Sequence, residues 1–337
     1  MDVHLLGWLG LTGIILAMIV VDIVGHVRTP HEPTLKEAAI WSAAYVAMAI
    51  VFGAIVWYFW GGEYTGQYFA GYVTEKALSI DNLFVFVIIL SAFRVPRAYQ
   101  QEVLLVGIVF ALVLRLIFIL AGTAMIEHWA WVFYLFGAWL LWVAVQQALE
   151  GATGDKEHAV EDEEYKPTGF VKLVARVVPM TDGFVGGKLI HRHAGKTAIT
   201  PLLLCIIAVG TADVMFAVDS IPAIFSVTRE PFLVFAANAF SLLGLRQLYF
   251  LIDGLLDRLV YLHYGLAAIL GFIGAKLLLH ALHENEVPFI NGGQPVHLLP
   301  EPSTMFSLGV IVCILTVTVI ASMVKSGMDK RKQLASK

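Results

Sequence analysis

Nine long apolar runs constrain the fold of this chain more than any other feature of its sequence. A helix needs roughly 20 mostly apolar residues to cross the hydrocarbon core of a bilayer, and each run is about that long or longer. Only 14% of the residues are charged, against about 25% in soluble domains. The sequence therefore predicts an all-α, polytopic membrane protein. The predicted spans are residues 5–25, 37–60, 67–93, 103–126, 129–149, 198–227, 231–252, 261–282 and 304–325.

Lysine and arginine gather on alternate connections between these spans. Of the 22 basic residues, 17 lie on one side, only Arg229 lies on the other, and four fall within spans. The positive-inside rule then places the N-terminus outside and the C-terminus in the cytoplasm. Residues 1–4 (MDVH) hold no Lys or Arg, so we expect the first run to be retained as a span rather than removed as a signal peptide. Residues 1–325 are one transmembrane domain in this prediction, and residues 326–337 are a cytoplasmic tail.

The long polar connection at residues 150–197 is predicted to be a cytoplasmic loop. Its first half, EGATGDKEHAVEDEEYKP, is acidic and poor in large apolar residues, which is typical of a disordered linker. Its second half contains FVKLVARVVP, where basic and apolar residues alternate at helical spacing. That pattern is compatible equally with a short helix on the membrane surface and with a solvated helix inside the loop.

Several function classes lack support in the residues. No basic face or Arg-rich arm indicates nucleic-acid binding. No nucleophile elbow, phosphate-binding loop or zinc signature is present, so we expect a protein that is not an enzyme and has no tightly bound cofactor. Cys205 and Cys313 both lie in apolar runs, and we interpret them as packing residues.

Two parts of the chain resemble each other. The blocks EKALSIDN and DVMFAVDS each hold two acids six residues apart, and the second block follows the first by 138 residues. FALVLR, which ends at Arg115, matches FSLLGLR, which ends at Arg246. YLFGAWLLWVAVQ likewise matches YGLAAILGFIGAK. Each matching unit, residues 67–149 and residues 198–282, holds three predicted spans, so the second copy enters the membrane the opposite way up. This is the pattern of a 3+3 inverted repeat of helices 3–5 and 6–8, which is common in transporters.

The acids of these blocks lie where a bilayer would be most hostile to charge. A charge at the bilayer centre costs about 2.5 to 3.5 kcal/mol even on the more lenient scales. Six residues of helix rotate by about 600° and rise by about 9 Å, so two acids of one helix lie roughly 120° apart and cannot easily share an ion. Between oppositely oriented helices, however, Glu75 comes level with Asp219, and Asp81 with Asp213. We therefore expect two layers of paired carboxylates.

Paired carboxylates from different helices suit a hard divalent cation such as Mn²⁺, Ca²⁺ or Mg²⁺. Asn82, Ser220 and Asn238 can add neutral oxygen ligands. Pro222 cannot donate a hydrogen bond to the carbonyl of Val218, which could ligate an ion beside Asp219, although an ordinary proline kink explains Pro222 nearly as well.

Basic residues within the spans offer a competing account of the acids. Arg115, Arg246 and Lys276, together with Lys76, could neutralise them as buried salt bridges. Other polar residues are weaker candidates. Asp22 could simply face the headgroups, and residues 191–193 (HRH) read as a basic surface turn. The histidines and acids at residues 280–286 could form an outer metal site, but a solvated helix end explains them better.

The blocks EKALSIDNLFVF, FAVDSIPAIF, NAFSLLGLRQLYFL and YGLAAILGFIGAKLLL together resemble the TerC family of integral membrane proteins, over residues 5–325. The resemblance implies a multi-pass protein of the bacterial inner membrane, from a family implicated in Mn²⁺ export, metal homeostasis and tellurite resistance. It also implies functional roles for Glu75, Asp81, Asn82, Asp213 and Asp219. The chain departs from the family pattern at Gly210, where many relatives have Glu.

Our leading hypothesis is a divalent metal exporter that moves Mn²⁺ as substrate from the cytoplasm to the exterior by alternating access. Its partners are then the lipid bilayer and the metal ion. The alternative is a non-transporting membrane scaffold that assists metal or tellurite resistance, or the metalation and secretion of envelope proteins, through residues 150–197. A tellurium oxyanion carrier fits less well, because four acids would repel an anion. A homodimer and envelope-protein partners both stay open.

Overall fold

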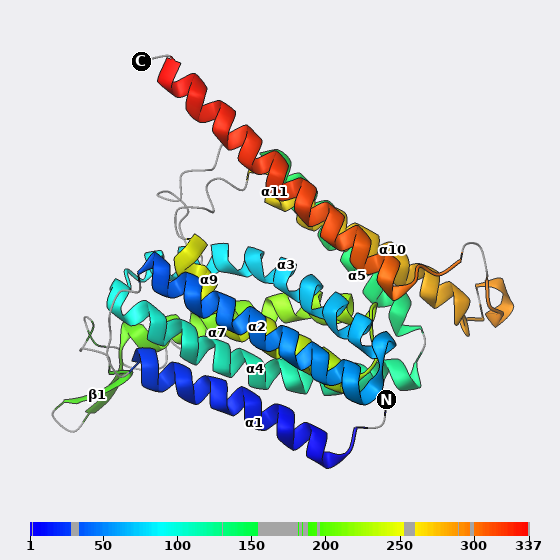
Figure 1. The fold of residues 1–337 in the computed structure, drawn as a ribbon, viewed down its shortest axis with the longest axis horizontal. Helices are drawn as coiled ribbons and strands as arrows, with labels where there is room; N and C mark the ends of the chain where they lie inside the picture. The colour runs from blue at the N-terminus through cyan, green and yellow to red at the C-terminus, as the bar shows by residue number, and fades with distance from the viewer. Residues whose placement is uncertain are drawn as a thin grey trace.

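The chain folds into long helices, as the computed structural model shows (Figure 1). The all-α class predicted from the sequence is confirmed, apart from one short β-hairpin. The structure describes residues 1, 3–27, 34–129, 131–153, 181, 184, 188–193, 196–252, 260–288, 290–296 and 300–335.

The helices follow the predicted spans closely. They are α1 (Leu5–Asp22), α2 (Leu35–Trp60), α3 (Gly62–Ala92), α4 (Arg97–His128), α5 (Val132–Thr153), α7 (Pro201–Phe225), α8 (Pro231–Leu243), α9 (Leu245–Ile252), α10 (Leu262–His283) and α11 (Thr304–Ala335). A π-helical turn, η1 (Ile23–Val27), follows α1, and a 3₁₀ turn, η4 (Asn291–Gly293), precedes α11.

Within the described residues, eight segments are long and apolar enough to cross a membrane. α3 is not among the eight, although its 31 residues make it longer than most of them. It carries Glu63, Glu75, Lys76 and Asp81, and this charge lowers its apolar character. A polytopic membrane fold is therefore established, and the ninth span remains a prediction that depends on α3.

The connection at residues 150–197 differs in part from the prediction. Ile190–His193 (β1) pairs with Lys196–Ile199 (β2) in an antiparallel hairpin, so the basic turn expected at residues 191–193 is wrong and these residues form a strand. The helix expected over FVKLVARVVP, and most of the acidic linker before it, lie outside the described residues.

Local sequence explains where the helices begin and end. The Thr34 hydroxyl accepts a hydrogen bond from the Glu37 amide and caps the start of α2. Gly61 separates α2 from α3 with a φ of 91° and a ψ of 177°, a conformation that is open essentially to glycine alone. Pro201 and Pro231 are the first residues of α7 and α8, where proline is favoured because its fixed φ suits a helix start.

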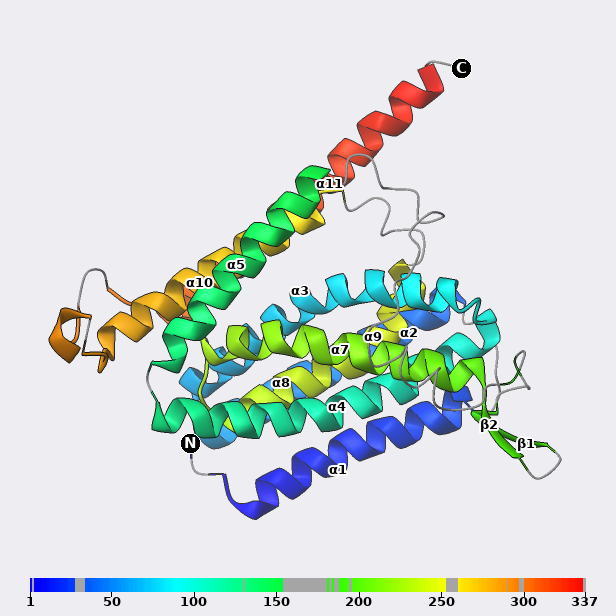
Figure 2. The ribbon, with the colours of Figure 1, turned by 180° about the vertical axis from the view of Figure 1, so that it is seen from behind.

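Two groups of helices are visible in the arrangement. α5, α10 and α11 lie side by side and are inclined to the remaining helices (Figures 1 and 2). In the larger group, α4 packs along α7 and α3 packs along α8, while α2 covers α3 and α9. α8 lies at the centre, and its residues from Phe232 to Leu243 are all buried.

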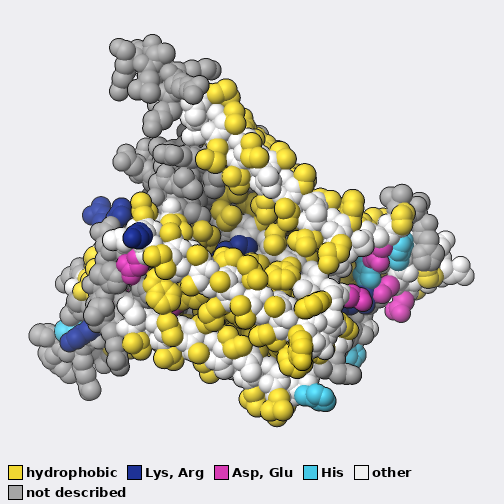
Figure 3. Space-filling view, viewed as in Figure 1, with side chains coloured by type: hydrophobic (Ala, Val, Ile, Leu, Met, Phe, Trp, Pro, Cys, Tyr) yellow, Lys and Arg dark blue, Asp and Glu magenta, His cyan; other side chains and the backbone are white. Residues whose placement is uncertain are grey.

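The outer surface of the molecule is strongly apolar. Large apolar side chains are exposed on α1, α2, α4, α5 and α11, and they cover most of the face seen in Figure 3. An apolar surface of this extent fits lipid rather than water. Buried polar side chains from α3, α4, α7 and α8 meet inside this apolar surface.

Candidate functional site

One guanidinium joins two acids at the centre of the larger helix group. Arg115 of α4 donates from Nε to Asp213 Oδ2 at 2.8 Å and from Nη2 to Asp213 Oδ1 at 3.1 Å. Its Nη1 donates to Glu75 Oε1, and also to Ser220 Oγ at 3.1 Å. The acids come from α3 and α7, so three helices meet at this cation. We call Arg115, Glu75, Asp213 and Ser220 the central cluster.

The central cluster is almost completely removed from solvent. The side chains of Arg115, Glu75 and Asp213 are 1–2% exposed. Removing one partner from a buried ion pair leaves an uncompensated charge, which typically costs about 3 to 5 kcal/mol. If both carboxylates are ionised, one guanidinium leaves the cluster with a net negative charge. The cluster can therefore accept one further positive charge, either a proton or part of a metal ion's charge.

Two buried residues, Glu75 of the central cluster and Asn238 of α8, carry side-chain atoms that lack partners among the described residues. Glu75 Oε2 is buried without a hydrogen bond, and so are both Oδ1 and Nδ2 of Asn238, a residue that is 0% exposed. Orphaned polar groups of this kind are costly in a native interior and call for an explanation.

Glu75 and Asn238 lie on two helices, α3 and α8, that pack against each other. A Cβ on Gly71 would lie 3.5 Å from the Cβ of Ala237, and the hydroxyls of Ser79 and Ser241 lie 3.4 Å apart. Glu75 is midway between Gly71 and Ser79, and Asn238 lies between Ala237 and Ser241. Both residues therefore belong to the segments of α3 and α8 that pack against each other.

Of the other predicted ligands with described side chains, Asp219 and Asn82 make no hydrogen bond to the central cluster. Asp219 Oδ1 accepts a hydrogen bond from Trp139 Nε1 at 2.7 Å, which ties α7 to α5. Asn82 is 3% exposed in α3. Asp81 also belongs to α3, but its side chain is outside the described part of the structure. Pro222 is buried inside α7, which continues to Phe225.

The predicted layers of acids are not what the described side chains form. Glu75, expected opposite Asp219, instead shares Arg115 with Asp213, which was expected in the other layer. Among the described residues, no three His, Cys, Asp or Glu side chains are grouped to hold a metal ion. In this conformation the guanidinium occupies the space between the two acids.

A second buried ion pair involves Asp22, the last residue of α1. Arg246 Nη2 donates to Asp22 Oδ1 at 2.7 Å, both side chains are 1% exposed, and the Tyr45 hydroxyl donates to the same oxygen. Asp22 is therefore buried, and the expectation that it faces the headgroups is wrong. Arg246 does compensate an acid, as predicted, but that acid is Asp22.

The two lysines within the spans, Lys76 and Lys276, do not contact the acids of the central cluster. Lys76 Nζ donates to the Ser241 carbonyl at 3.2 Å. Lys276, which we expected to compensate the acids, is 7% exposed and lines a cavity near the end of α7.

At Gly210 a Cβ would come within 2.7 Å of the Phe110 ring, so the Glu of the family pattern could fit only if that ring moved.

Two hydrogen-bond donors to the buried acids, Trp139 and Tyr45, were not predicted from the sequence. Trp139 lies in an apolar run of α5 where no residue pattern marks it as a partner for Asp219. Tyr45 is similarly unmarked in α2, although Asp22 in an apolar run does signal that some donor must meet it. Only the packing of α2 against α9 brings Tyr45 to the Asp22–Arg246 pair.

Comparison with known proteins gives a consistent result. A family model described as integral membrane protein TerC family matches residues 60–330. No solved structure matches the chain.

Curated relatives extend over most of the chain. An uncharacterized membrane protein of Mycobacterium tuberculosis is 53% identical over 309 residues, which cover 92% of this chain and 77% of the relative. An uncharacterized membrane protein of Myxococcus xanthus is 39% identical over 319 residues, covering 95% and 92%. The Escherichia coli protein Alx, described as a candidate membrane-bound redox modulator, is 38% identical over 285 residues, covering 81% and 85%.

Proposed function

Because the chain belongs to the TerC family of integral membrane proteins, we propose that it exports a hard divalent metal ion, with Mn²⁺ as the first substrate to test. The observation that carries the proposal is the convergence of Glu75 and Asp213 on one buried cation. Two carboxylates from different helices, with Asn238 Oδ1 and Ser220 Oγ as neutral oxygens, form the ligand chemistry that such ions prefer.

The relation between the two acids supports an inverted repeat. Glu75 and Asp213 are the first acids of the two matching blocks, 138 residues apart. A pseudo-twofold axis between the repeats would bring such residues together. The packing is reciprocal in the same sense: α3 of the first unit packs on α8 of the second, α7 of the second packs on α4 of the first, and α5 pairs with α10.

Arg115 has a specific role in this proposal. In the conformation described here it acts as an internal cation that offsets part of the charge of the two acids while no metal is between them. An entering divalent ion would displace the guanidinium and bind Glu75, Asp213 and Asn238 in its place. Exchange of the guanidinium for a transported cation would let the carrier change orientation without leaving both buried acids uncompensated.

Asp81, Asn82 and Asp219 are proposed as later or earlier ligands on the same path. Asp219 and Asp81 are the second acids of the two blocks. Because Asp219 is joined to Trp139 of α5, movement of α5 relative to α7 would release its carboxylate. The proposed direction of transport is from the cytoplasm to the exterior, in an inner-membrane protein whose N-terminus is predicted to lie outside.

A redox function, suggested by the name of the relative Alx, has less support in the chain. Cys205 is buried in α7, Cys313 is exposed on α11, and both are free thiols. The proposed export depends on the acids and not on the cysteines. Replacing both cysteines with Ser should therefore leave metal export unchanged.

The test is metal retention in cells that express Glu75→Gln or Asp213→Asn. Cells loaded with Mn²⁺ and expressing either variant should retain more metal than cells expressing the wild type. Glu286→Gln, an exposed isosteric control outside the spans, should export like the wild type. Membrane levels of each variant, measured by immunoblot, separate lost transport from lost folding.

Equal retention by Asp213→Asn and wild type at equal membrane levels would remove the transport proposal. The scaffold alternative makes the opposite prediction. Deleting residues 152–166 would abolish metal resistance while the acid variants kept it.

A further inference from the structure

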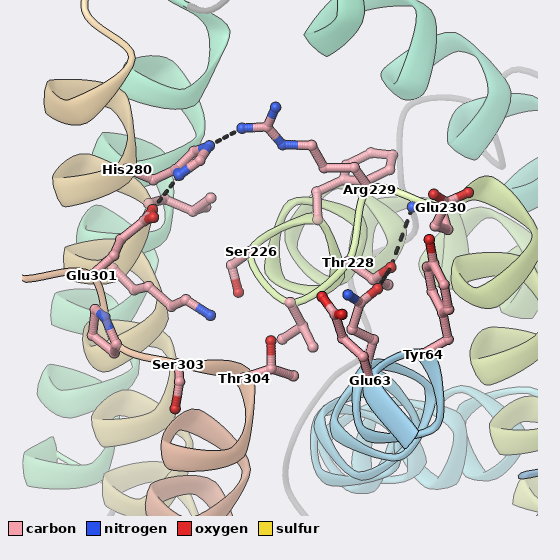
Figure 4. Close-up of a pocket in the computed structure, with 16 residues that line it drawn as sticks. Glu63, Tyr64, Ser226, Thr228, Arg229, Glu230, His280, Glu301, Ser303 and Thr304 are labelled. Carbon is pink, nitrogen blue, oxygen red and sulfur yellow. Dashed lines mark hydrogen bonds and ion pairs between the residues drawn. The ribbon is translucent and has the colours of Figure 1, made fainter. Parts of the chain in front are cut away.

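A polar cavity of about 460 Å³ lies where α7 and α10 end and α3 and α11 begin (Figure 4). Ser226 at its wall follows Ser220 of the central cluster by six residues, a rise of about 9 Å along a helix. Hydroxyl groups of Ser226, Thr228, Ser303 and Thr304 line it. By the predicted orientation this cavity is at the outer end of the protein. We call it the outer cavity.

Most charges around the outer cavity are already paired. Glu230 accepts from the Met1 amino group at 2.7 Å, and Arg229 donates to Glu284 at 2.7 Å. His280 bonds through Nδ1 to Glu301, as Figure 4 shows. Glu63 also borders the cavity, but it is exposed, so water solvates its carboxylate.

Lys276 is the exception. Its side chain lines the outer cavity and is 7% exposed, yet within the described part of the chain it has no hydrogen bond and no ion pair within 4 Å. Glu301, which also lines the outer cavity, is already bound to His280. A buried ammonium without a partner is expensive, and it is normally met by a counter-charge.

The start of α11 adds a second attraction for negative charge. The Ser303 hydroxyl accepts from the Phe306 amide and caps this 32-residue helix. Ser303 and Thr304 both line the outer cavity. The amide groups of a helix N-terminus carry partial positive charge and bind oxyanions.

We propose that the outer cavity binds an anionic oxygen group, a carboxylate or a phosphate, at Lys276 between the end of α7 and the start of α11. Such a group could come from a free anion in the outer solution or from the headgroup of an anionic lipid. The site is separate from the central cluster, and its ligand has the opposite charge to the proposed metal substrate.

The test uses the purified full chain in nanodiscs of neutral phosphatidylcholine, titrated with inorganic phosphate at constant ionic strength by calorimetry. The wild type should bind phosphate saturably. Lys276→Gln should weaken binding by about tenfold or more, the expected effect of losing one charge-assisted hydrogen bond. Lys276→Arg should retain binding, and Lys188→Gln, an exposed lysine outside the spans, should not change it.

A second arm identifies the source of the anionic group. In nanodiscs with phosphatidylglycerol, a headgroup in the outer cavity would block phosphate binding to the wild type. Phosphatidylglycerol would then copurify with the wild type and not with Lys276→Gln. If free phosphate is the ligand, binding is the same in both lipids.

The proposal is overturned if the wild type neither binds phosphate saturably nor retains phosphatidylglycerol. It is equally overturned if Lys276→Gln binds like the wild type. A rise in the thermal midpoint of Lys276→Gln with no phosphate response in either protein would identify Lys276 as an uncompensated charge and nothing more. None of these measurements involves metal transport, so they succeed or fail independently of the proposed export.

Discussion

At the scale of single residues, Arg115 decides how two buried acids coexist. Its Nε and Nη2 make a two-pronged contact with Asp213, and its Nη1 reaches Glu75 and Ser220. This planar set of donors cannot be reproduced by lysine. The guanidinium also fixes the relative positions of α3, α4 and α7, so the same contacts serve stability and the proposed ion exchange.

Arg115→Gln should destabilise the protein by about 3 to 5 kcal/mol, because it leaves two carboxylates buried without a counter-charge. Added Mn²⁺ should recover much of this loss by taking the place of the guanidinium. The measurement is the thermal unfolding midpoint in detergent with and without Mn²⁺. A variant that is destabilised but shows no greater Mn²⁺ response than the wild type would count against Arg115 as an internal cation.

The hydroxyl of Tyr45 makes a second residue-scale prediction. Tyr45→Phe should cost about 1.5 to 3 kcal/mol, the range for losing a hydrogen bond to a charged group, because Asp22 would lose one of its donors. Tyr58→Phe is the matched control, since Tyr58 lies in the same helix and is 80% exposed. Chemical or thermal unfolding of both variants provides the comparison, and equal stability of the two would show that the Tyr45 contact contributes little.

At the scale of elements, the junction between α2 and α3 depends on one glycine. Gly61 has a φ of 91° and a ψ of 177°, whereas Gly62 is the first residue of α3. Neither would bring an added Cβ within 4 Å of other atoms, so the two differ in backbone conformation rather than in space.

Gly61→Ala should therefore destabilise the protein by about 1 to 3 kcal/mol, the cost of a strained backbone region. Gly62→Ala should be close to neutral. The difference between their unfolding midpoints isolates the conformational term, and a neutral Gly61→Ala would mean that the α2–α3 junction can adopt another turn.

The helices were predictable because apolar length is a strong signal, and residues 67–93, all but the last of which lie in α3, were expected to be helical despite their charges. The partners of the buried acids were harder to predict from the sequence. The six-residue spacing correctly indicated that Asp213 and Asp219 could not face one group, and they do contact different residues, Arg115 and Trp139. Which partner each acid meets depends on how far each helix rotates against its neighbours, and spacing within one helix carries no information about that.

At the scale of the whole molecule, the N-terminus is tied to the connection between α7 and α8. The hydrogen bond to Glu230 raises the pKa of the Met1 amino group from 8.0 to about 10. Because the folded-state pKa is raised, the contact between the Met1 amino group and Glu230 stabilises the folded state fully below pH 8. This stabilisation is lost as the pH rises through about 10.

Raising the pH from 8 to above 10 should therefore lower the thermal midpoint of the wild type more than that of Glu230→Gln. Scans of both proteins in matched buffers give the measurement. Parallel curves would show that the contact between Met1 and Glu230 adds nothing to stability.

The central position of α8 has a consequence for how the molecule is assembled. The segment Pro231–Leu251 has the lowest mean hydropathy of the eight candidate spans, and 94% of its apolar window is enclosed by other helices. A segment this weakly apolar gains little by partitioning into lipid alone during synthesis. We therefore expect this segment to insert only after the helices that precede it in the chain are already in the bilayer. The order of synthesis then matters for correct folding.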